Sequence, residues 1–517
     1  MKKILAFLLT LAMSVTVITS LSACKKPDLD DFEGTTITFY HTMSATNLQP
    51  VLNNYIEKFN VIYPGIRVTA TQEGNYDDVR KKVSSELQIG EGPNIAYCYP
   101  DHVALYNRSK TVVVLDDFIN SSESVPAGKF GNKDAMPIGL TQAQIDDFIK
   151  GYYDEGKQFG DGKMYTLPFS KSTEVLYYNE KAFIAAGLYT EVDGNKVATP
   201  PTTWWCTKQG HKGNPQENCA ECKTSMEYAC MKLKAYDSYC IPLGYDSEAN
   251  WFITMCEQLG LPYTSATAGQ PHYLFNTDAH KDFITTINGW YNKRWVTTQK
   301  IYGSYTSGLF VESPEAAPNS MDAKGENAIV RSYMSIGSSA GAGHQCPKAI
   351  DNKLAFNVGI ASIPQIDATN GKVISQGPSV CLFSNATEDE ILASWLFVKY
   401  LTTNVAFQAD FSIASGYVPV IKSVNEDTTY ANHLKKKGVD TKSGVISNSA
   451  QVCLTQEEFY FTSPAFSGSS KAREEAQALL TKCLVFENTN AAVLKKNIDE
   501  AFAQAISNCE YHFNDVK

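Results

Sequence analysis

The sequence predicts an α/β fold with mostly parallel sheets, divided into at least two lobes. Short β-rich runs alternate with amphipathic helical runs between residues 36 and 99, the pattern of consecutive βαβ units. About 490 residues follow a predicted export signal, enough for two or more hydrophobic cores. Residues 474–485 and 491–506 have helical apolar spacing, so we expect a helical C-terminal part.

The first elements follow from residue periodicity. Each predicted strand is rich in β-branched or aromatic residues, and each predicted helix gathers its apolar residues on one face. The expected strands are residues 36–40, 66–70 and 95–99, and the expected helices are residues 48–59, 76–89 and 395–401. Polar and aromatic residues follow each strand. Because parallel sheets bind ligands at the carboxyl ends of their strands, we expect the site there.

The N-terminal residues have the features of an export signal. Met1-Lys2-Lys3 is basic, and the apolar run over residues 4–18 is shorter than the roughly 20 residues that span a bilayer. Residues 21–24 (LSAC) resemble a bacterial lipobox. We therefore expect a signal peptide over residues 1–23, lipidation of Cys24, a tether over residues 24–35, and anchoring to the extracellular face of the cell membrane. The alternative is an ordinary signal peptide with a chance cysteine.

Composition restricts the possible partners. The formal net charge of −10 argues against nucleic-acid binding, which needs clustered positive charge. Hydrophobic residues make up 43% of the chain and charged residues 19%, as expected of a folded protein. The 28 Tyr and 25 Phe include rings that can stack on sugars, although core packing accounts for most of them.

A cysteine-rich segment lies over about residues 202–240. Cys206, His211, Cys219 and Cys222 are residue types that zinc prefers, and Cys230 and Cys240 follow. Their spacing matches no familiar zinc module. We therefore expect an insertion without metal, tied by disulfides or simply reduced, whose start is anchored by packing of Trp204-Trp205.

Seven segments in a fixed order carry a family resemblance. They are residues 39–43 (FYHTM), 73–76 (EGNY), 167–179 (LPFSKSTEVLYYN), 185–188 (AAGL), 203–204 (TW), 356–364 (FNVGIASIP) and 416–420 (GYVPV). The chain resembles the family 1 extracellular solute-binding proteins, the capture subunits of ABC carbohydrate importers. Within that family it is most similar to the glycerol-3-phosphate binding subunits.

The resemblance implies a periplasmic-binding-protein-like fold. Two α/β lobes are joined by crossing strands and close over the ligand as a hinged trap. On this chain the first lobe takes residues 36–168 plus 376–414, and the second takes 169–375 plus 415–517. The implied partners are a small-molecule sugar and a membrane permease with its ATPase, and the protein is expected to be a monomer without cofactors.

The resemblance also implies ligand contacts. They fall on Tyr76, Ser172, Trp251, Ser338, Gly377 and Tyr417. Two positions depart from the subgroup pattern. The acidic residue that binds hydroxyl groups falls on Pro100, with Asp101 beside it, and the phosphate-binding arginine falls on Phe466. Because a ring cannot replace a guanidinium, we expect a neutral sugar stacked on Phe466. Arg473 lies seven residues later and is the candidate that would partly replace the missing arginine if the ligand is a phosphate ester.

The expected function is a binding lipoprotein that captures a sugar or oligosaccharide by hinge closure. A glycerol-3-phosphate or phosphodiester-binding subunit is the alternative within the family, and a surface glycan hydrolase or adhesin is the alternative of another class. Residues 337–341 match the G-x-S-x-G pattern of hydrolases. His344 is too close to serve Ser339, and His433 lies in a lysine-rich segment expected to face solvent. We expect no catalytic residue.

Overall fold

The computed structural model describes residues 32–267, 269–313, 330–436 and 438–515. The predicted signal peptide, Cys24 and most of the predicted tether lie outside these residues. None of the described helices is both long enough and apolar enough to cross a membrane.

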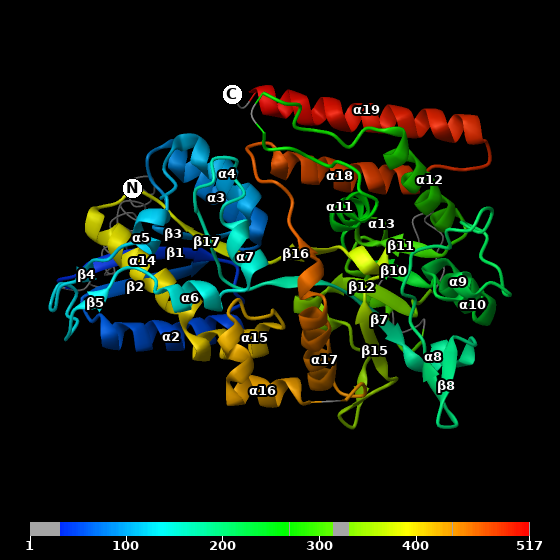
Figure 1. Cartoon of the computed structure of the whole chain (residues 1–517), viewed down its shortest axis with the longest axis horizontal. Coiled ribbons are helices and arrows are strands. Elements are labelled where there is room, and N and C mark those ends of the chain that lie inside the picture. Colours follow the sequence, from blue (N-terminus) through cyan, green and yellow to red (C-terminus); the bar gives the residue numbers. More distant parts are fainter. Residues whose placement is uncertain (1–31, 268, 314–329, 437, 516–517) are drawn as a thin grey trace, which may run out of the picture.

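A five-stranded sheet forms the core of the first lobe, on the left in Figure 1. Its strand order is β2 (Ile66–Gln72), β1 (Thr35–His41), β3 (Ile95–Cys98), β17 (Ser379–Leu382), β6 (Leu167–Pro168). β1 runs parallel to β2 and β3, whereas β17 is antiparallel to β3 and β6. The sheet is therefore mixed, because β17 returns from the other lobe in the opposite direction.

Helices cover both faces of this sheet. α2 (Leu48–Ile62) and α14 (Glu388–Thr403) pack on one face, where Ile95 and Tyr97 point, and α15 (Val405–Ser415) packs on α2. α3 (Tyr76–Gln88) and α4 (Pro100–Tyr106) pack on the other face, against Ala96 and Cys98. This alternation along β3 follows from the two-residue period of a strand.

The second lobe contains a larger mixed sheet, on the right in Figure 1. Its order is β11 (Val296–Thr298), β10 (Leu243–Tyr245), β12 (Met334–Ser338), β7 (Ser172–Asn179), β16 (Val373–Gln376), β18 (Tyr460–Phe461), and β15 (Val358–Ser362) also pairs with β7. β10 is parallel to β11 and β12, whereas β7 is antiparallel to β12, β15 and β16. All eight residues of β7 are buried, as befits a central strand.

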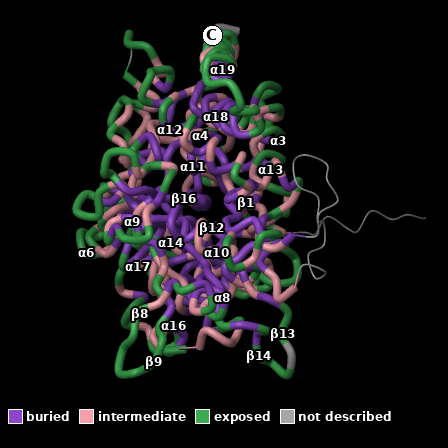
Figure 2. The backbone as a smooth tube through the Cα atoms, turned by 90° about the vertical axis from the view of Figure 1, so that its right-hand side faces the viewer, coloured by how far each residue is buried: buried purple, intermediate pink, exposed green. Residues whose placement is uncertain are grey.

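Long helices complete this lobe. They are α11 (Glu248–Gln258), α12 (Asp278–Asn292), α17 (Lys442–Thr455), α18 (Ser469–Leu484) and α19 (Ala491–Asp515). α18 packs against α11, α12 and α19, whereas α17 packs on β15. Figure 2 shows α19 at one end of the molecule and the exposed hairpin β8–β9 (Tyr189–Val192, Asn195–Ala198) at the other. The predicted helical C-terminal part is confirmed.

Short elements connect these units. The remaining α-helices are α5 (Asp116–Ile119), α6 (Gln142–Asp147), α7 (Lys150–Glu155), α8 (Glu180–Ala185), α9 (Ala220–Lys223), α10 (Met226–Tyr236), α13 (Gln299–Tyr302) and α16 (Thr428–Leu434). The remaining strands are β4 (Ser124–Val125), β5 (Met136–Pro137), β13 (Ala349–Ile350) and β14 (Lys353–Leu354).

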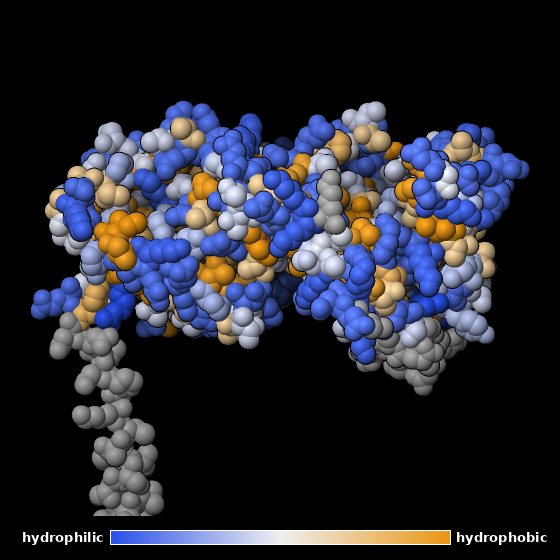
Figure 3. All heavy atoms as spheres, turned by 90° about the horizontal axis from the view of Figure 1, so that it is seen from below, coloured by the Kyte–Doolittle hydropathy of each residue, from blue (hydrophilic) through white to orange (hydrophobic). Residues whose placement is uncertain are grey.

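Crossing segments connect the two lobes. The backbone N–H of Lys171 donates to the carbonyl of Val418 at 3.1 Å, and the N–H of Val418 donates back to Lys171 at 2.7 Å. The N–H of Phe169 donates to the carbonyl of Pro378 at 3.1 Å. Figure 3 shows the resulting outline, two bulky halves with a narrower middle. The exact lobe limits, 36–168 plus 376–414 and 169–375 plus 415–517, stay a prediction.

Candidate ligand-binding site

A cavity of about 370 Å³ lies between the lobes. The first lobe contributes the start of α3 and the turn from β3 into α4. The second lobe contributes α11, the end of β16, α18 and the segment that precedes α18. The turn after β3 lies at a carboxyl strand end, where the parallel sheet predicts a site.

Tyr76 enters the cavity from the first turn of α3. Asn75 and Asp78 form a capping box that fixes this helix start. The Tyr76 hydroxyl lies 3.2 Å from that of Tyr417, and its ring packs against Tyr99 with centroids 4.5 Å apart. Burial raises the pKa of Tyr76 well above its usual value, so the hydroxyl stays protonated and can donate or accept hydrogen bonds.

Asp101 reaches the cavity from the first turn of α4. Its carboxylate accepts a hydrogen bond from the Ser470 hydroxyl of α18 at 2.9 Å, across the two lobes. Its other oxygen lies 4.0 Å from Nε2 of His102, whose pKa burial lowers. Asp101 is therefore placed to accept solute hydroxyl groups at the line where the lobes meet.

Two arginines line the cavity, and they differ in their partners. Arg80 pairs with Asp77 at 3.3 Å and Glu474 at 3.4 Å. The half-buried Arg473 donates to the amide oxygen of Asn250, whose amide nitrogen donates to Gln376 at 2.7 Å. Among the described residues, no carboxylate lies within 4.0 Å of the Arg473 guanidinium. Arg473 therefore keeps hydrogen-bond donors for an anionic group.

The crossing segments form one end of the site. Lys171 is fully buried and pairs with Glu155, which lines the cavity. The Nζ of Lys171 also donates a hydrogen bond to the Gly377 carbonyl at 3.1 Å. Gly377 has φ of +112°, and a Cβ there would lie 2.6 Å from the Ser170 carbonyl oxygen. A glycine is needed because two backbones approach closely.

The remaining predicted polar contacts lie beside the cavity. The Ser338 hydroxyl donates to that of Ser172 at 3.1 Å, where β12 meets β7. Tyr417 reaches the site through its bond to Tyr76. The structure thus gathers Tyr76 and Asp101 on the cavity wall, and places Tyr417, Gly377, Ser172 and Ser338 around the crossing segments.

Two predicted aromatic contacts lie elsewhere. Trp251 is completely buried and stacks on Tyr245, with centroids 4.6 Å apart. Phe466 packs on His272 at 4.9 Å and against Phe513 of α19, and it is not among the residues that line the cavity. The structure therefore does not place either ring where a solute in this cavity can stack on it, because Trp251 lies in the hydrophobic core of the second lobe and Phe466 packs on His272 and Phe513.

Sequence reasoning did not include Arg80, Tyr99 or Gln376 among the ligand contacts and gave Arg473 only a secondary role. Tyr99 had a positional signal, because it is the last residue of the strand predicted over residues 95–99, where we expected the site. Arg80 and Arg473 each lie one turn or more inside a helix, and nothing local distinguishes them from solvent-exposed arginines.

The hydrolase-like pattern has a structural explanation. The Ser339 side chain is buried, and its hydroxyl accepts the N–H of Thr173 at 3.3 Å. The expectation that His433 faces solvent was wrong: it is 6% exposed and lies beside Tyr430, because its short helix turns it toward the core.

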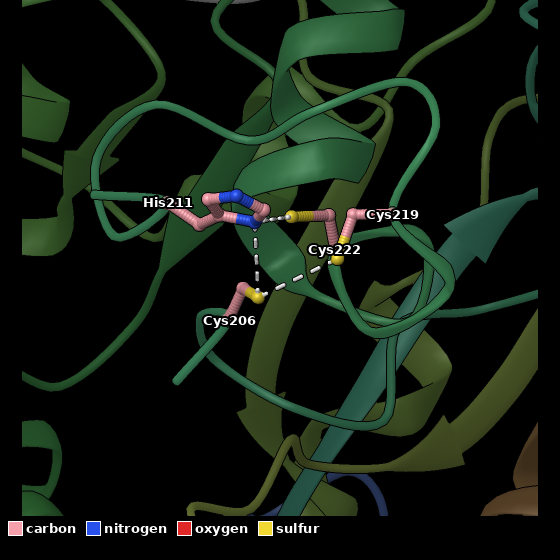
Figure 4. Close-up of side chains that lie close together, drawn as sticks. All are labelled: Cys206, His211, Cys219 and Cys222. Atoms are coloured by element: carbon pink, nitrogen blue, oxygen red, sulfur yellow. Dashed lines mark hydrogen bonds between the residues drawn. The ribbon is translucent and has the colours of Figure 1, made fainter. Parts of the chain in front are cut away.

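The cysteine-rich insertion holds the second notable cluster. Ligand atoms of Cys206, His211, Cys219 and Cys222 lie within 4.8 Å of one another (Figure 4). All cysteines among the described residues are free thiols, so the disulfide-tied form of the insertion is not observed. Trp204 is fully buried, which confirms its predicted anchoring role.

Comparisons with known proteins agree with this architecture. A family model described as bacterial extracellular solute-binding protein matches residues 54–437. The sn-glycerol-3-phosphate-binding periplasmic protein UgpB of Escherichia coli K12 is 29% identical over 170 residues, which are 33% of each chain. The chain thus matches about a third of the length of these curated relatives.

Solved structures share the fold at low sequence identity. UgpB from Mycobacterium tuberculosis in complex with glycerophosphocholine has a TM-score of 0.64 and 16% identity, covering 93% of this chain and 100% of that one. The GacH receptor of Streptomyces glaucescens has a TM-score of 0.60 and 14% identity, covering 92% and 99%. Since the family model covers most of the residues, this chain belongs to the bacterial extracellular solute-binding proteins.

Proposed function

We propose that this protein captures a small polyhydroxylated solute, a sugar or a glycerol phosphate derivative, between its two lobes and delivers it to an ABC importer. The cavity between the lobes carries the proposal. It combines tyrosine hydroxyls, the Asp101 carboxylate, side-chain amides and the Arg473 guanidinium. Such groups bind hydroxyls and fix the orientation of a polar ligand.

The size of the cavity favours a small solute. Ligand pockets range over roughly 300–1,000 Å³, and about 370 Å³ lies near the lower end. A monosaccharide, a disaccharide or a glycerophosphodiester suits this volume better than a long oligosaccharide.

Arg473 favours an anionic group on the solute. Its guanidinium faces the cavity without a carboxylate partner in the described part of the chain, whereas Arg80 is already paired. A guanidinium binds a phosphate through strong, charge-assisted hydrogen bonds. The name of the UgpB relatives points the same way. A neutral sugar is the second candidate, since it needs only the hydroxyl-binding groups.

A binding screen tests the proposal. Thermal shifts should be measured with glycerol-3-phosphate, glycerophosphodiesters, monosaccharides and maltodextrins, since a ligand at 100 times its Kd stabilises a protein by about 2.7 kcal/mol. We expect a phosphate ester to give the largest shift and Arg473→Gln to weaken its binding at least about tenfold. Arg108→Gln, an exposed change on another surface, should have no effect.

Two results would contradict these assignments. One such result is that a neutral sugar gives the largest shift and binds to Arg473→Gln with the same affinity as to the wild type. An anionic group on the solute is then excluded, and the neutral-sugar candidate stands. If no compound of these classes binds, the polyhydroxylated solute itself is wrong.

Export and partners rest on the family and on the N-terminal residues. The proposed lipid on Cys24 holds a monomer at the extracellular face of the membrane, where it meets the permease and its ATPase. Labelling of cells with a fatty-acid analogue should mark the wild type and not Cys24→Ser. The protein is proposed to bind without turnover, so hydrolysis of glycans or esters that Ser339→Ala abolishes would overturn that assignment.

A further inference from the structure

Four side chains of the insertion meet at one point (Figure 4). Sγ of Cys206 lies 3.9 Å from Sγ of Cys219 and 3.6 Å from Nδ1 of His211. Sγ of Cys222 lies 3.3 Å from the same Nδ1. All four ligand atoms fall within 4.8 Å of one another.

Three of these separations match the edge lengths of a zinc tetrahedron. With Zn–S bonds of about 2.3 Å and Zn–N bonds of about 2.0–2.1 Å, tetrahedral angles place two sulfurs about 3.8 Å apart and a sulfur and a nitrogen about 3.6 Å apart. The observed 3.9, 3.6 and 3.3 Å agree with these values to within a few tenths of an ångström. Cys219 and Cys222 also have the short Cys-x2-Cys spacing common among zinc ligands.

The loop between these ligands lacks the means to fold by hydrophobic burial. Residues 207–218 (TKQGHKGNPQEN) contain no apolar side chain apart from that of Pro215. Nevertheless Cys206, Cys219 and Cys222 at its ends are buried, with exposed fractions of 1%, 6% and 0%. Hydrogen bonds hold this loop in the structure, such as that from the Gly213 N–H to the Glu227 carboxylate at 2.9 Å. A cross-link would stabilise a polar loop of this kind further, and small polar segments commonly use metals for this purpose.

A disulfide explains the cluster less well. Disulfide sulfurs lie about 2.05 Å apart, and one bond would use two thiols while leaving a third thiol and His211 without a function. Other cysteines, such as Cys256 and Cys483, are buried in the apolar core, as expected of core residues. Among the described residues, only this group of three thiols and an imidazole meets the geometry of a metal site.

We propose that Cys206, His211, Cys219 and Cys222 bind one zinc ion as a structural site. Four protein ligands fill the tetrahedron, so no position stays open for a substrate. Trp204, two residues before Cys206, packs against Trp251 of α11 at 6.1 Å, and α11 forms part of the cavity wall. The metal thus secures the insertion behind the solute-binding wall of the second lobe.

Metal analysis of the full-length protein tests the site. Protein purified under reducing conditions and loaded with Zn²⁺ should retain about one zinc per chain after exhaustive dialysis. Replacement by Co²⁺ should give the intense thiolate-to-cobalt absorption of a tetrahedral site. Cys222→Ser and His211→Ala should lose this metal, whereas Cys483→Ser, which removes a buried thiol elsewhere, should keep it.

A second measurement uses the wild type alone, because a variant that does not fold would lose zinc for that reason only. Chelation of zinc from the wild type should lower the midpoint of thermal unfolding and open residues 207–218 to protease, and Zn²⁺, not Mg²⁺, should reverse both effects. Three results would overturn the proposal: zinc well below one per chain in loaded wild type, zinc retained equally by both ligand variants, or a disulfide between two of these cysteines in protein isolated without reductant.

Discussion

Arg80 of α3 and Glu474 of α18 form an ion pair across the cavity, with Nη2 and Oε1 3.4 Å apart. The two residues belong to different lobes, so their attraction acts only when the lobes are close together. The hydrogen bond between Asp101 and Ser470 spans the same gap.

Glu474→Gln should shift the ligand-free protein toward the open state. A partly exposed pair of this kind contributes up to about 1 kcal/mol, enough to change the ratio of closed to open molecules several-fold. Small-angle scattering should show a larger radius of gyration for the variant. High salt should reduce the difference because it screens the pair. Glu500→Gln, in an exposed pair on α19, is the control, and an equal change there would exclude an interlobe role.

Gly377→Ala should destabilise the protein. The added Cβ would lie 2.6 Å from the Ser170 carbonyl oxygen, and φ of +112° already disfavours alanine. We expect a loss of about 1–3 kcal/mol in denaturant unfolding. Gly289 lies in the interior of α12, and no neighbouring element comes within 4 Å of a Cβ added there. Gly289→Ala should therefore raise the free energy of unfolding by roughly 0.5–1 kcal/mol. Equal effects of the two changes would contradict a close approach at Gly377.

Breaking the buried ion pair Lys171–Glu155 should lower the free energy of unfolding far more than breaking an exposed pair. Their side chains are 0% and 4% exposed, so Glu155→Gln leaves a buried ammonium ion without its counter-charge. Removal of one partner from a buried pair costs about 3–5 kcal/mol. Asp154→Asn, which breaks the exposed pair with Lys150, should cost less than about 1 kcal/mol. A mild effect of Glu155→Gln would show that water reaches Lys171.

Glu174 should make stability depend on pH. Burial raises the pKa of this carboxyl from 4.5 to about 7, although hydrogen bonds from Tyr245 and Asn250 and the charge of Arg473 oppose the rise. Between pH 4.5 and about 7 the Glu174 carboxyl is more protonated in the folded state than in the unfolded state. The free energy of unfolding therefore falls as the pH rises through this range.

Glu174→Gln should remove this penalty. Relative to wild type, the variant should change little near pH 4.5 and gain on the order of 3 kcal/mol by pH 8. Urea unfolding at several pH values measures the gain, and the exposed Glu191→Gln is the control. A gain that does not vary with pH would show that the Glu174 carboxyl titrates normally.

Local sequence was sufficient to predict the strand and the helix on either side of the turn that leads to Tyr76. The capping residues Asn75 and Asp78 lie within three positions of each other, and the apolar spacing of α3 repeats within one helix, so the helix start and the placement of Tyr76 were predictable. The mixed character of both sheets was not predictable in this way, because the direction of β17 depends on where the chain returns from the second lobe.

The binding residues also divide into those predictable from local sequence and those that only tertiary packing places. Alternation, helical spacing and the ordered segments from residue 39 to residue 420 by themselves determined the α/β class and the family, since these features depend on neighbours in the chain. Only the tertiary structure decided that Arg473 faces the cavity while Phe466 packs on His272 and Phe513. The reason is physical: the direction of a side chain near the start of α18 is set by packing against α11 and α19, whose residues are distant in sequence.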